Sequence, residues 1–378
     1  MKRLLVISEI IAPYRIPVFN ALAARDDIDL QVAFLSETDP GLRQWRVYKD
    51  EIKFDYAVLP ALRRRLGKYN LLINRGVHAM LERTRPEAIL CGGYNYLASW
   101  QALRWAEKEG VPFLLWLEST AADERRQTRI VESLKRRFLS RCHGFVVPGR
   151  AAAEYLHQFG IPDSTIFRAP NAVDHSFFVE RAQRARAQAD CLRKKLCLPP
   201  RYFVYVGRLV SAKGVFELLE AYAKLEEALR SRIGLLLVGD GRARGKLEQR
   251  ASGVQPGTVH FAGFVQKENL VPYYALADAL ILPTHSDTWG FVVNEAMACA
   301  CPVIVSAVAG CVPDLVEEDW NGKIIPAHDV GQITSAMKFL SEHDQLRTQM
   351  GARSAQRIGG YTPEKCAAGI AEAVAACA

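Results

Sequence analysis

The stretch that decides the fold class is Leu282-Pro-Thr-His-Ser-Asp287-Thr-Trp-Gly-Phe291-Val-Val-Asn-Glu295-Ala-Met-Ala298. An apolar strand ends at Leu282, a polar loop follows, and a helix begins near Phe291. Because ligands of open α/β sheets bind beyond the carboxyl ends of the strands, we expect Asp287 and Glu295 to face a cleft. There, both carboxylates would accept hydrogen bonds from sugar hydroxyl groups. Their spacing alone is equally compatible with two acids that only cap or solvate the helix.

The alternation of apolar strands and helices continues on both sides of this stretch. We expect strands at 3–8, 30–35, 88–91, 113–117 and 145–147, and again at 202–206, 234–238, 259–262, 279–282 and 303–305. Continuous apolar strands of this kind predict parallel sheets that are covered on both faces. The arginine-rich stretch 169–200 between the two series is interpreted as an irregular linker.

The predicted fold class is therefore α/β, with two doubly wound, Rossmann-like domains that face a cleft. We place an acceptor-binding domain at 1–175 and a donor-binding domain at 176–362. A terminal helix at 363–378, which opens with Thr362-Pro363-Glu364, is expected to pack back on the first domain.

Composition excludes several classes of protein. The chain has 378 residues, 49 Lys and Arg against 41 Asp and Glu, and nine cysteines. No stretch approaches the roughly 20 apolar residues of a membrane span, and Glu9 interrupts the apolar run at the N-terminus, so we expect neither a membrane helix nor a signal peptide. An odd number of cysteines without a C-x-x-C pair argues against a disulfide framework or structural zinc, and predicts a cytoplasmic setting.

A second constellation follows the first strand of the second domain: Val206-Gly207-Arg208-Leu-Val-Ser-Ala-Lys213-Gly214. Glycines let a ligand approach the backbone, and the two bases supply a fork and a point charge for a pyrophosphate. The alternative is a strand-to-helix turn with two solvated bases. The glycine turn at Gly239 has no acidic residue about 20 positions further on, which argues against a nicotinamide cofactor.

Together, these motifs resemble the second domain of family 4 glycosyltransferases, which are retaining enzymes of the GT-B fold. The resemblance covers most of residues 165–330. The motifs that carry it are Ala169-Pro-Asn-Ala-Val-Asp174, Gly207-Arg-Leu, Ser211-Ala-Lys-Gly214, Val238-Gly-Asp-Gly241, Phe261-Ala-Gly-Phe264, Tyr273-Tyr-Ala-Leu-Ala-Asp278 and the paired-acid stretch.

This resemblance implies a role for each matching position. Arg208 and Lys213 would hold the donor diphosphate and stabilise the leaving group, and Glu295 would hold the nucleotide ribose. Asp287 stands where the family usually has a glutamate that contacts the donor sugar, so it is a departure from the pattern. We take Arg208, Lys213 and Asp287 as the catalytic set. The donor-binding set adds Gly207, Gly239, Gly263, Phe264, Val265, Gly290, Phe291, Val292 and Glu295.

The first domain departs further from the family. Its first strand is followed by Ile11-Ala-Pro-Tyr-Arg15-Ile-Pro17 instead of a glycine-rich loop, and Leu117-Glu118-Ser-Thr120 replaces a His-Asp pair. We expect acceptor or phosphate contacts from Arg15, Tyr94, Glu118 and, in the second domain, His285. Each of these could instead be a structural residue on a turn or in the core. We expect no metal ion and no cofactor, because no histidine pair or carboxylate cluster has ligand spacing.

Two basic runs, 63–68 and 125–141, account for part of the positive charge. In the second run Ile130, Leu134 and Phe138 share a helical face, a pattern that suits an anionic bilayer. A solvated helix packed on its own sheet is the alternative. The runs lack interleaved stacking aromatics, so nucleic acid is not an expected partner.

The sequence thus predicts a metal-independent, retaining hexosyltransferase that takes a nucleotide-diphosphate sugar, with UDP-sugar as first choice. The expected acceptor is a hydroxyl of a lipid-linked or growing glycan in cell-surface polysaccharide synthesis, at the inner face of the membrane. Two alternatives stay open: a non-catalytic nucleotide-sugar-binding protein, and an epimerase or phosphorylase of the same fold.

Overall fold

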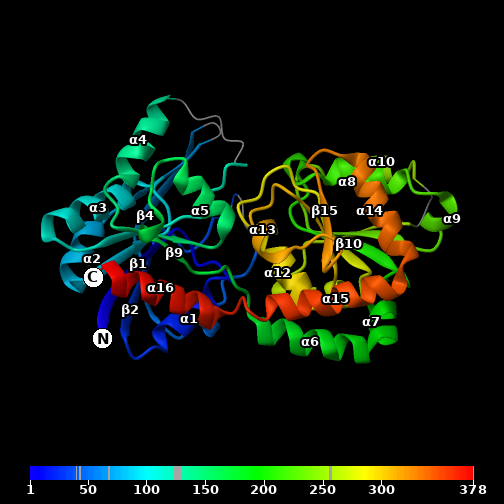
Figure 1. The fold of residues 1–378 in the computed structure, drawn as a ribbon, viewed down its shortest axis with the longest axis horizontal. Coiled ribbons are helices and arrows are strands. Elements are labelled where there is room, and N and C mark those ends of the chain that lie inside the picture. The colour runs from blue at the N-terminus through cyan, green and yellow to red at the C-terminus, as the bar shows by residue number, and fades with distance from the viewer. Residues whose placement is uncertain (40, 42–43, 67–68, 123–128, 255–257, 378) are drawn as a thin grey trace. The chain divides into compact units, whose positions relative to one another are not determined.

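The computed structural model describes residues 1–39, 41, 44–66, 69–122, 129–254 and 258–377. The chain forms two compact units, each an α/β structure (Figure 1). Unit 1 comprises Met1–Ala172 and Pro363–Ala378, and unit 2 comprises Val173–Thr362. The division thus falls three residues before the expected boundary at 175.

Unit 1 is built on a seven-stranded parallel sheet. Its strands lie in the order β3 (Asp55–Val58), β2 (Ile28–Phe34), β1 (Lys2–Ser8), β6 (Ala88–Cys91), β7 (Phe113–Trp116), β8 (Gly144–Val147) and β9 (Ile166–Arg168). A separate antiparallel hairpin pairs β4 (Ala61–Leu66) with β5 (Tyr69–Asn74).

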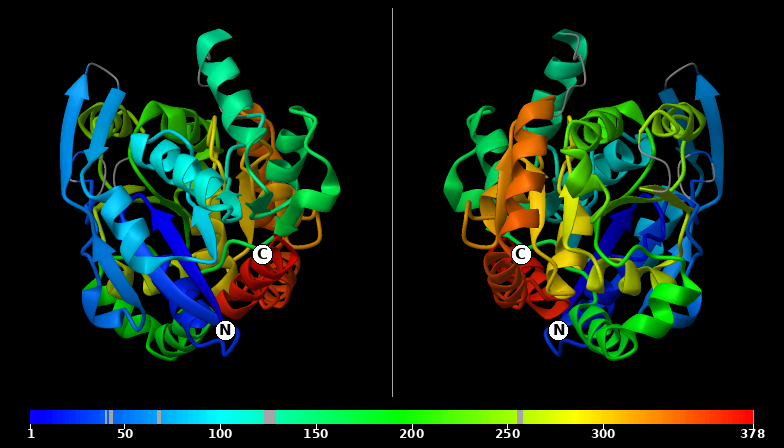
Figure 2. Two further views of the ribbon diagram at one scale, coloured as in Figure 1. Left: turned by 90° about the vertical axis from the view of Figure 1, so that its left-hand side faces the viewer. Right: turned by 90° about the vertical axis from the view of Figure 1, so that its right-hand side faces the viewer.

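The helices of unit 1 are α1 (Ile16–Ala23), α2 (Val77–Thr84), α3 (Leu97–Glu109), α4 (Arg129–Leu139), α5 (Arg150–His157) and α16 (Pro363–Cys377), with short 3₁₀ turns at Lys49–Glu51 and Asp163–Thr165. The terminal helix α16 lies beside α1 and packs on β8 and β9 (Figure 1). Helix α4 stands out from the sheet of unit 1 (Figure 2).

Unit 2 is built on a six-stranded parallel sheet. Its strands lie in the order β12 (Val259–Gly263), β11 (Gly234–Val238), β10 (Tyr202–Val206), β13 (Ala279–Leu282), β14 (Val303–Ser306) and β15 (Gly322–Ile325). Its helices are α6 (His175–Ala187), α7 (Ala189–Lys195), α8 (Val215–Ala223), α9 (Glu227–Arg230), α10 (Arg244–Ala251), α11 (Lys267–Ala275), α12 (Phe291–Ala298), α13 (Val312–Leu315), α14 (Val330–Glu342) and α15 (Asp344–Ile358), with a 3₁₀ turn at Ser211–Lys213.

The two sheets are buried on both faces, which explains their continuous apolar strands. In β1, Leu5 and Ile7 join one core cluster while Leu4 and Val6 join the cluster on the opposite face. In β10 the alternate residues divide between two clusters in the same way. This two-sided burial confirms the predicted fold class of doubly wound parallel sheets.

One prediction about local structure is wrong. Residues 176–200 are not irregular, because α6 and α7 occupy most of them. The Asp174 carboxylate accepts a hydrogen bond from the Phe177 amide and caps α6, and Phe178, Ala182 and Ala185 bury one side of that helix. The arginines between these apolar residues lie on the other side and concealed the helical spacing. No helix among the described residues is long and apolar enough to span a bilayer.

Each sheet has one point where the strand order reverses direction. In unit 1, β1 pairs with β2 on one side and with β6 on the other. In unit 2, β10 lies between β11 and β13. Crevices for ligands form at such reversals, beyond the carboxyl ends of the strands. We call this end of each sheet its carboxyl edge.

Candidate functional site

At the carboxyl edge of unit 2, the loops that follow β10 and β13 touch each other directly. Gly214, at φ 68°, lies so close to the second loop that a Cβ atom there would stand 1.9 Å from the carbonyl oxygen of Pro283. The backbone amide of His285 donates a hydrogen bond of 3.0 Å to the Ala212 carbonyl. Only glycine fits at position 214, and the contact brings two functional loops together.

An ion pair joins these two loops. The Lys213 Nζ atom lies 2.5 Å from Oδ2 of Asp287, and the two side chains are 19% and 20% exposed. The backbone of Asp287 is itself held, since its carbonyl accepts a hydrogen bond of 3.0 Å from the Gly310 amide. The structure therefore brings together two residues that are 74 positions apart and that the sequence assigned to one site.

Arg208 lies in the same loop as Lys213 but is held differently. Its backbone carbonyl accepts a 2.8 Å hydrogen bond from the Tyr205 hydroxyl, which fixes the main chain. Its side chain is exposed, and no described residue forms an ion pair with its guanidinium. Arg208 therefore presents an uncompensated positive charge to solvent at the carboxyl edge.

The loops after β11 and β12 extend the site. Gly239 approaches Gly207 so closely that a Cβ atom would lie 1.9 Å from the Gly207 carbonyl oxygen, and its amide donates a 2.7 Å hydrogen bond to the Gly263 carbonyl. Phe264 follows at the end of β12 with 40% of its surface exposed, whereas Val265 packs against the core. An exposed aromatic ring at this position offers a flat face on which a nucleobase can stack.

Glu295 lies on α12, where it is partly buried. The Tyr274 hydroxyl on α11 donates a hydrogen bond of 2.6 Å to its Oε2 atom. Burial raises the pKa of Glu295 to about 7, although the hydrogen bond from Tyr274 opposes this shift. The carboxyl group of Glu295 therefore holds its proton to a higher pH than a solvated glutamate does.

The first turn of α12 completes the edge. The helix begins at Phe291 after Gly290, which adopts φ 99°, and no side chain of the cap residue accepts a hydrogen bond from its first turn. The buried Trp289 ring donates a 2.8 Å hydrogen bond from its Nε1 atom to Asn294 and ties the loop to this turn. The partial positive charge at a helix start suits an anionic ligand.

In unit 1 the structure brings Arg15 and Glu118 into an ion pair. The Arg15 guanidinium also donates a 3.2 Å hydrogen bond to Asn171 and lies 3.8 Å from the ring centroid of Trp116. Asn171 in turn donates a 3.0 Å hydrogen bond to Glu118. Only 12% of the Arg15 side chain is exposed, so its charge is largely engaged within unit 1.

The side chains of two other predicted residues, Tyr94 and His285, contact other groups than these clusters. The Tyr94 ring packs near Phe138 of α4, with 6.0 Å between the ring centroids. His285 turns toward Glu217, whose Oε1 atom lies 3.2 Å from its Nε2 atom. Neither arrangement assigns the residue to a donor or an acceptor.

The sequence interpretation missed Tyr274, Asn171 and Trp116 as parts of these clusters. Tyr274 and Asn171 belong to motifs that carried the family resemblance, so their position in those motifs was the available signal. Their contacts to Glu295 and Glu118 depend on tertiary packing. No local spacing in the sequence indicates them.

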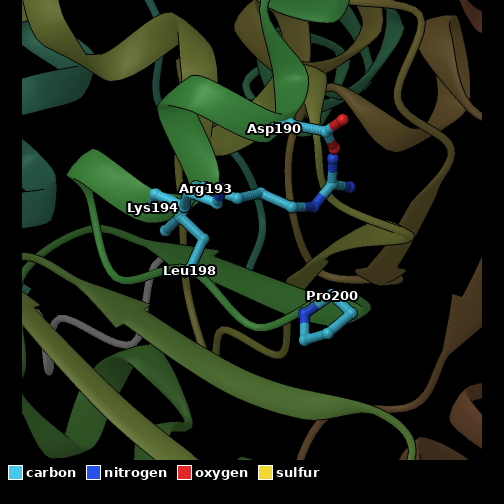
Figure 3. Close-up of a pocket in the computed structure, with 5 residues that line it drawn as sticks. All are labelled: Asp190, Arg193, Lys194, Leu198 and Pro200. Carbon is cyan, nitrogen blue, oxygen red and sulfur yellow. The ribbon is translucent and has the colours of Figure 1, made fainter.

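The surface groove in Figure 3 lies at the opposite end of the unit 2 sheet. Its lining residues are Asp190, Arg193, Lys194, Leu198 and Pro200. Pro200 precedes β10, whereas Arg208 follows that strand. The hollow therefore belongs to the amino ends of the strands, where parallel sheets do not place their ligands.

Two family models match the chain. One, described as glycosyl transferases group 1, matches residues 192–357, and the other, described as glycosyltransferase family 4, matches residues 20–177. The first match covers the carboxyl edge of unit 2 with Arg208, Lys213, Asp287 and Glu295. The second covers most of unit 1, including Glu118 and Asn171.

The individual proteins to which the chain is similar are also named as glycosyltransferases. The chain is 27% identical over 224 residues to a D-inositol 3-phosphate glycosyltransferase of Kineococcus radiotolerans, covering 55% of this chain and 51% of the relative. It is 39% identical over 134 residues to a Bacillus subtilis protein whose name refers to teichuronic acid biosynthesis, covering 35% of this chain and 32% of that protein. The chain thus spans about half or less of these relatives' length.

A solved structure shares the fold over nearly the whole chain. The crystal structure of Anabaena HepE in complex with UDP aligns with a TM-score of 0.78 at 16% identity, covering 99% of this chain and 100% of that one. At this identity the likeness establishes the fold, which is that of the GT-B glycosyltransferases.

Proposed function

The chain belongs to glycosyltransferase family 4, and from that membership we propose that it transfers a sugar from a nucleotide-diphosphate donor to an acceptor hydroxyl. The observation that carries this proposal is the Lys213–Asp287 ion pair, which joins the loops after β10 and β13 at the strand-order reversal of unit 2, with the exposed Arg208 in the first of these loops. The exposed guanidinium of Arg208 and the ammonium of Lys213, near the positive end of the α12 dipole, match the charge of a diphosphate.

Each donor group has a matching protein group at this edge. The diphosphate would lie between Arg208, Lys213 and the start of α12, and the ribose hydroxyls would bond to Glu295. The base would lie against Gly263–Val265, with the exposed Phe264 ring available for stacking. We propose UDP as the nucleotide, in keeping with the UDP held by the Anabaena structure of the same fold.

The proposed reaction retains the anomeric configuration. The acceptor oxygen attacks the anomeric carbon from the face that the diphosphate leaves, and its proton passes to the departing phosphate oxygen. The bond between the anomeric carbon and that phosphate oxygen breaks, giving a glycoside and a nucleoside diphosphate. Arg208 and Lys213 stabilise the negative charge that grows on the leaving group, so the step needs no metal ion.

Asp287 has two roles in this proposal. Before the donor binds, it neutralises Lys213, which limits the cost of keeping that ammonium partly buried. When the diphosphate takes over Lys213, the Asp287 carboxylate becomes available to a hydroxyl of the donor sugar. The aspartate side chain is one methylene shorter than the glutamate that the family usually has at this position, so the carboxylate of Asp287 stays closer to its own loop.

A turnover assay with a panel of UDP-sugars and lipid-linked oligosaccharides tests the function. We expect release of UDP that depends on acceptor, and a product whose anomeric proton coupling matches that of the donor. Interconversion of the donor without acceptor would identify an epimerase, and phosphate-dependent release of sugar phosphate would identify a phosphorylase. Donor binding without any turnover would identify a binding protein. Each of these three results contradicts the proposal.

We further propose that the acceptor is a lipid-linked or growing surface glycan and that α4 contacts an anionic membrane. Ile130, Val131 and Leu134 on α4 are 73%, 49% and 49% exposed, and Arg137 lies one turn beyond Leu134. Phe138 is buried in the core of unit 1, so it does not share this exposed apolar surface. Part of the basic run 125–141 lies outside the described residues.

Vesicle flotation tests the membrane contact. The double variant Ile130→Ser, Leu134→Ser should lose at least about tenfold in binding to vesicles that contain anionic lipid, because it removes two apolar side chains from the interface. Leu97→Ser, which removes a half-exposed leucine from α3, is the matched control and should bind as the native chain does. Equal binding by both variants would show that α4 does not lie on the membrane.

A further inference from the structure

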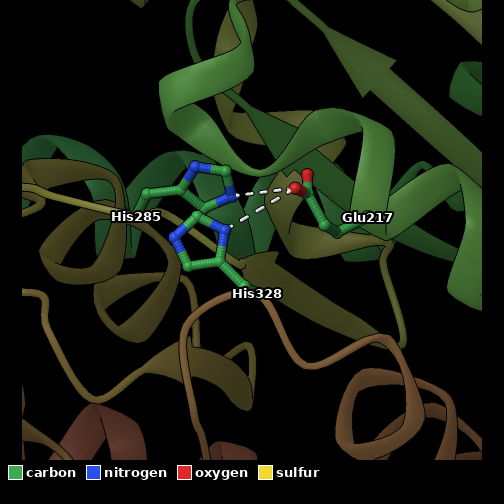
Figure 4. Close-up of side chains that lie close together, drawn as sticks. All are labelled: Glu217, His285 and His328. Carbon is green, nitrogen blue, oxygen red and sulfur yellow. Dashed lines mark ion pairs between the residues drawn. The ribbon is translucent and has the colours of Figure 1, made fainter.

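A separate group of side chains at the carboxyl edge of unit 2 takes no part in the proposed transfer. Glu217 on α8, His285 in the loop after β13 and His328 in the loop after β15 turn toward one another (Figure 4). Their ligand atoms all lie within 4.8 Å of each other. Three segments that are distant in the sequence therefore place one carboxylate and two imidazoles around a common point.

The spacing of these atoms resembles that of a metal site. Oε1 of Glu217 lies 3.2 Å from Nε2 of His285 and 3.8 Å from Nδ1 of His328. A tetrahedral ion with ligands at about 2.0–2.1 Å requires ligand atoms about 3.3–3.4 Å apart. The two imidazole rings have centroids 3.6 Å apart, so a small rotation of the exposed His328 ring would bring its Nδ1 atom to the same ion.

Burial and backbone geometry support the site. The second carboxylate oxygen of Glu217, Oε2, is buried without a hydrogen-bond partner among the described residues, which is costly for an anion unless a cation lies nearby. The His285 side chain is only 9% exposed. His328 adopts φ 65°, a left-handed conformation that residues other than glycine rarely adopt, and this conformation is part of the backbone path that turns its ring toward Glu217.

We propose that Glu217, His285 and His328 bind one divalent transition-metal ion, with Zn²⁺ as the best match. Imidazole nitrogen with a single carboxylate suits Zn²⁺, Co²⁺ and Ni²⁺, whereas Mg²⁺ and Ca²⁺ prefer all-oxygen shells. Three protein ligands leave a fourth position for water or an anion. The ion takes no part in sugar transfer, and the site does not depend on the proposed function.

The bound ion would stabilise the arrangement of the donor edge. Glu217 lies four residues after Lys213, and His285 lies two residues before Asp287. The His285 amide already donates a hydrogen bond to the Ala212 carbonyl, so the two loops are in contact next to the cluster. An ion held by both segments and by the loop after β15 would cross-link the residues that flank the Lys213–Asp287 pair.

Thermal unfolding of the full chain with added Zn²⁺ tests the proposal. The exposed thiols of Cys191 and Cys197 would also bind Zn²⁺, so the background protein carries Cys191→Ser and Cys197→Ser. At a free Zn²⁺ concentration of 100 times Kd, we expect the Tm of the full chain to rise by about 3–4 °C. Mg²⁺ at the same concentration should leave Tm within about 1 °C.

Variants in this background locate the ion. His328→Ala and Glu217→Gln should each weaken Zn²⁺ binding at least tenfold, measured by competition with a chromogenic chelator. His157→Ala is the matched control, because His157 also pairs with a carboxylate, that of Asp163 at 2.8 Å, but without a second histidine. Without metal, all variants should melt within about 2 °C of the background, which shows that they fold.

Three results would overturn the proposal. The first is that Zn²⁺ does not raise the Tm of the background protein, which has all three proposed ligands. The second is a Zn²⁺ affinity that neither His328→Ala nor Glu217→Gln changes. The third is that Mg²⁺ stabilises the protein as much as Zn²⁺ does. None of these measurements depends on a sugar donor or acceptor. A failure of the glycosyltransferase assay therefore leaves this test intact.

Discussion

The carboxyl edges of the two sheets hold their arginines in opposite ways. In unit 1, Arg15 has an ion-pair partner in Glu118, a hydrogen-bond partner in Asn171 and the Trp116 ring against its guanidinium. In unit 2, Arg208 is exposed and no described residue forms an ion pair with it. The difference teaches that an arginine at a carboxyl edge is engaged by neighbouring side chains in one unit, whereas the guanidinium of the other has no ion-pair partner among the described residues.

The difference extends to the acids of the two edges. Glu118 is tied into a three-residue cluster that needs no ligand. Asp287 has Lys213 as its ion-pair partner, and burial raises the pKa of Glu295 to about 7. The acids and bases of unit 2 can therefore change partners or protonation when a ligand binds.

The largest expected effect follows from removing the exposed arginine. Arg208→Ala should lower kcat about 10²–10³-fold, because it removes one preorganised positive charge from the leaving group. Steady-state turnover of the UDP-sugar measures this loss. Arg232→Ala is the control, since Arg232 is also exposed in unit 2 but precedes β11 at the amino ends of the strands. If both variants lost kcat to a similar extent, the position of Arg208 at the carboxyl edge would not explain its effect on turnover.

The next effect concerns the pH dependence of stability. The pKa of Glu295 is about 7 in the folded chain, against about 4.5 for a free side chain. The folded state thus holds this proton more tightly, and the resulting stabilisation, present below pH 4.5, is lost as the pH rises through 7. From pH 5 to pH 8, the free energy of unfolding should fall by about 2–3 kcal/mol more in the native chain than in Glu295→Gln.

Urea unfolding at the two pH values measures this difference. Because the glutamine keeps the size of the side chain and does not ionise, other titrating groups cancel in the comparison. If the native chain and the variant lost stability in parallel between the two pH values, Glu295 would ionise as a solvated residue does, which would contradict its raised pKa.

A smaller effect tests the structural role of Arg15. Arg15→Ala should lower the free energy of unfolding by about 2 kcal/mol, since it leaves the partly buried Glu118 carboxylate without its cation. Arg3→Ala provides the control, because the Arg3–Glu87 pair is 53% and 43% exposed and its loss should leave the free energy of unfolding nearly unchanged. If Arg15→Ala instead left stability unchanged and abolished donor turnover, Arg15 would be a phosphate ligand and the contrast with Arg208 would fail.

The sequence predicted those parts of the fold that rest on two-sided burial. The apolar strands β1, β6, β10 and β13 were placed to within a residue or two. Strands that are short or charged were missed, among them β9 with three residues and β4, whose arginines were read as a basic run. These elements form because a neighbouring strand supplies hydrogen-bond partners, which no local apolar pattern reveals.

Some residues of the candidate site could be predicted from the sequence, and others could not. Arg208, Lys213 and Asp287 could be placed at one edge from the sequence, because each follows a predicted strand and parallel strands end together. The partners of Glu295 and Glu118 could not, since Tyr274 and Asn171 reach them only after the chain has folded. The group of Glu217, His285 and His328 escaped notice for the same reason, as its members come from three separate loops and helices.

Isothermal titration of UDP into the native chain, Arg208→Ala and Arg232→Ala tests most directly whether the carboxyl edge of unit 2 holds a nucleotide diphosphate. We predict one binding site per chain, an affinity at least tenfold weaker in Arg208→Ala, and an unchanged affinity in Arg232→Ala. No binding by the native chain, or equal affinity in all three proteins, would contradict the assignment of this edge to the donor.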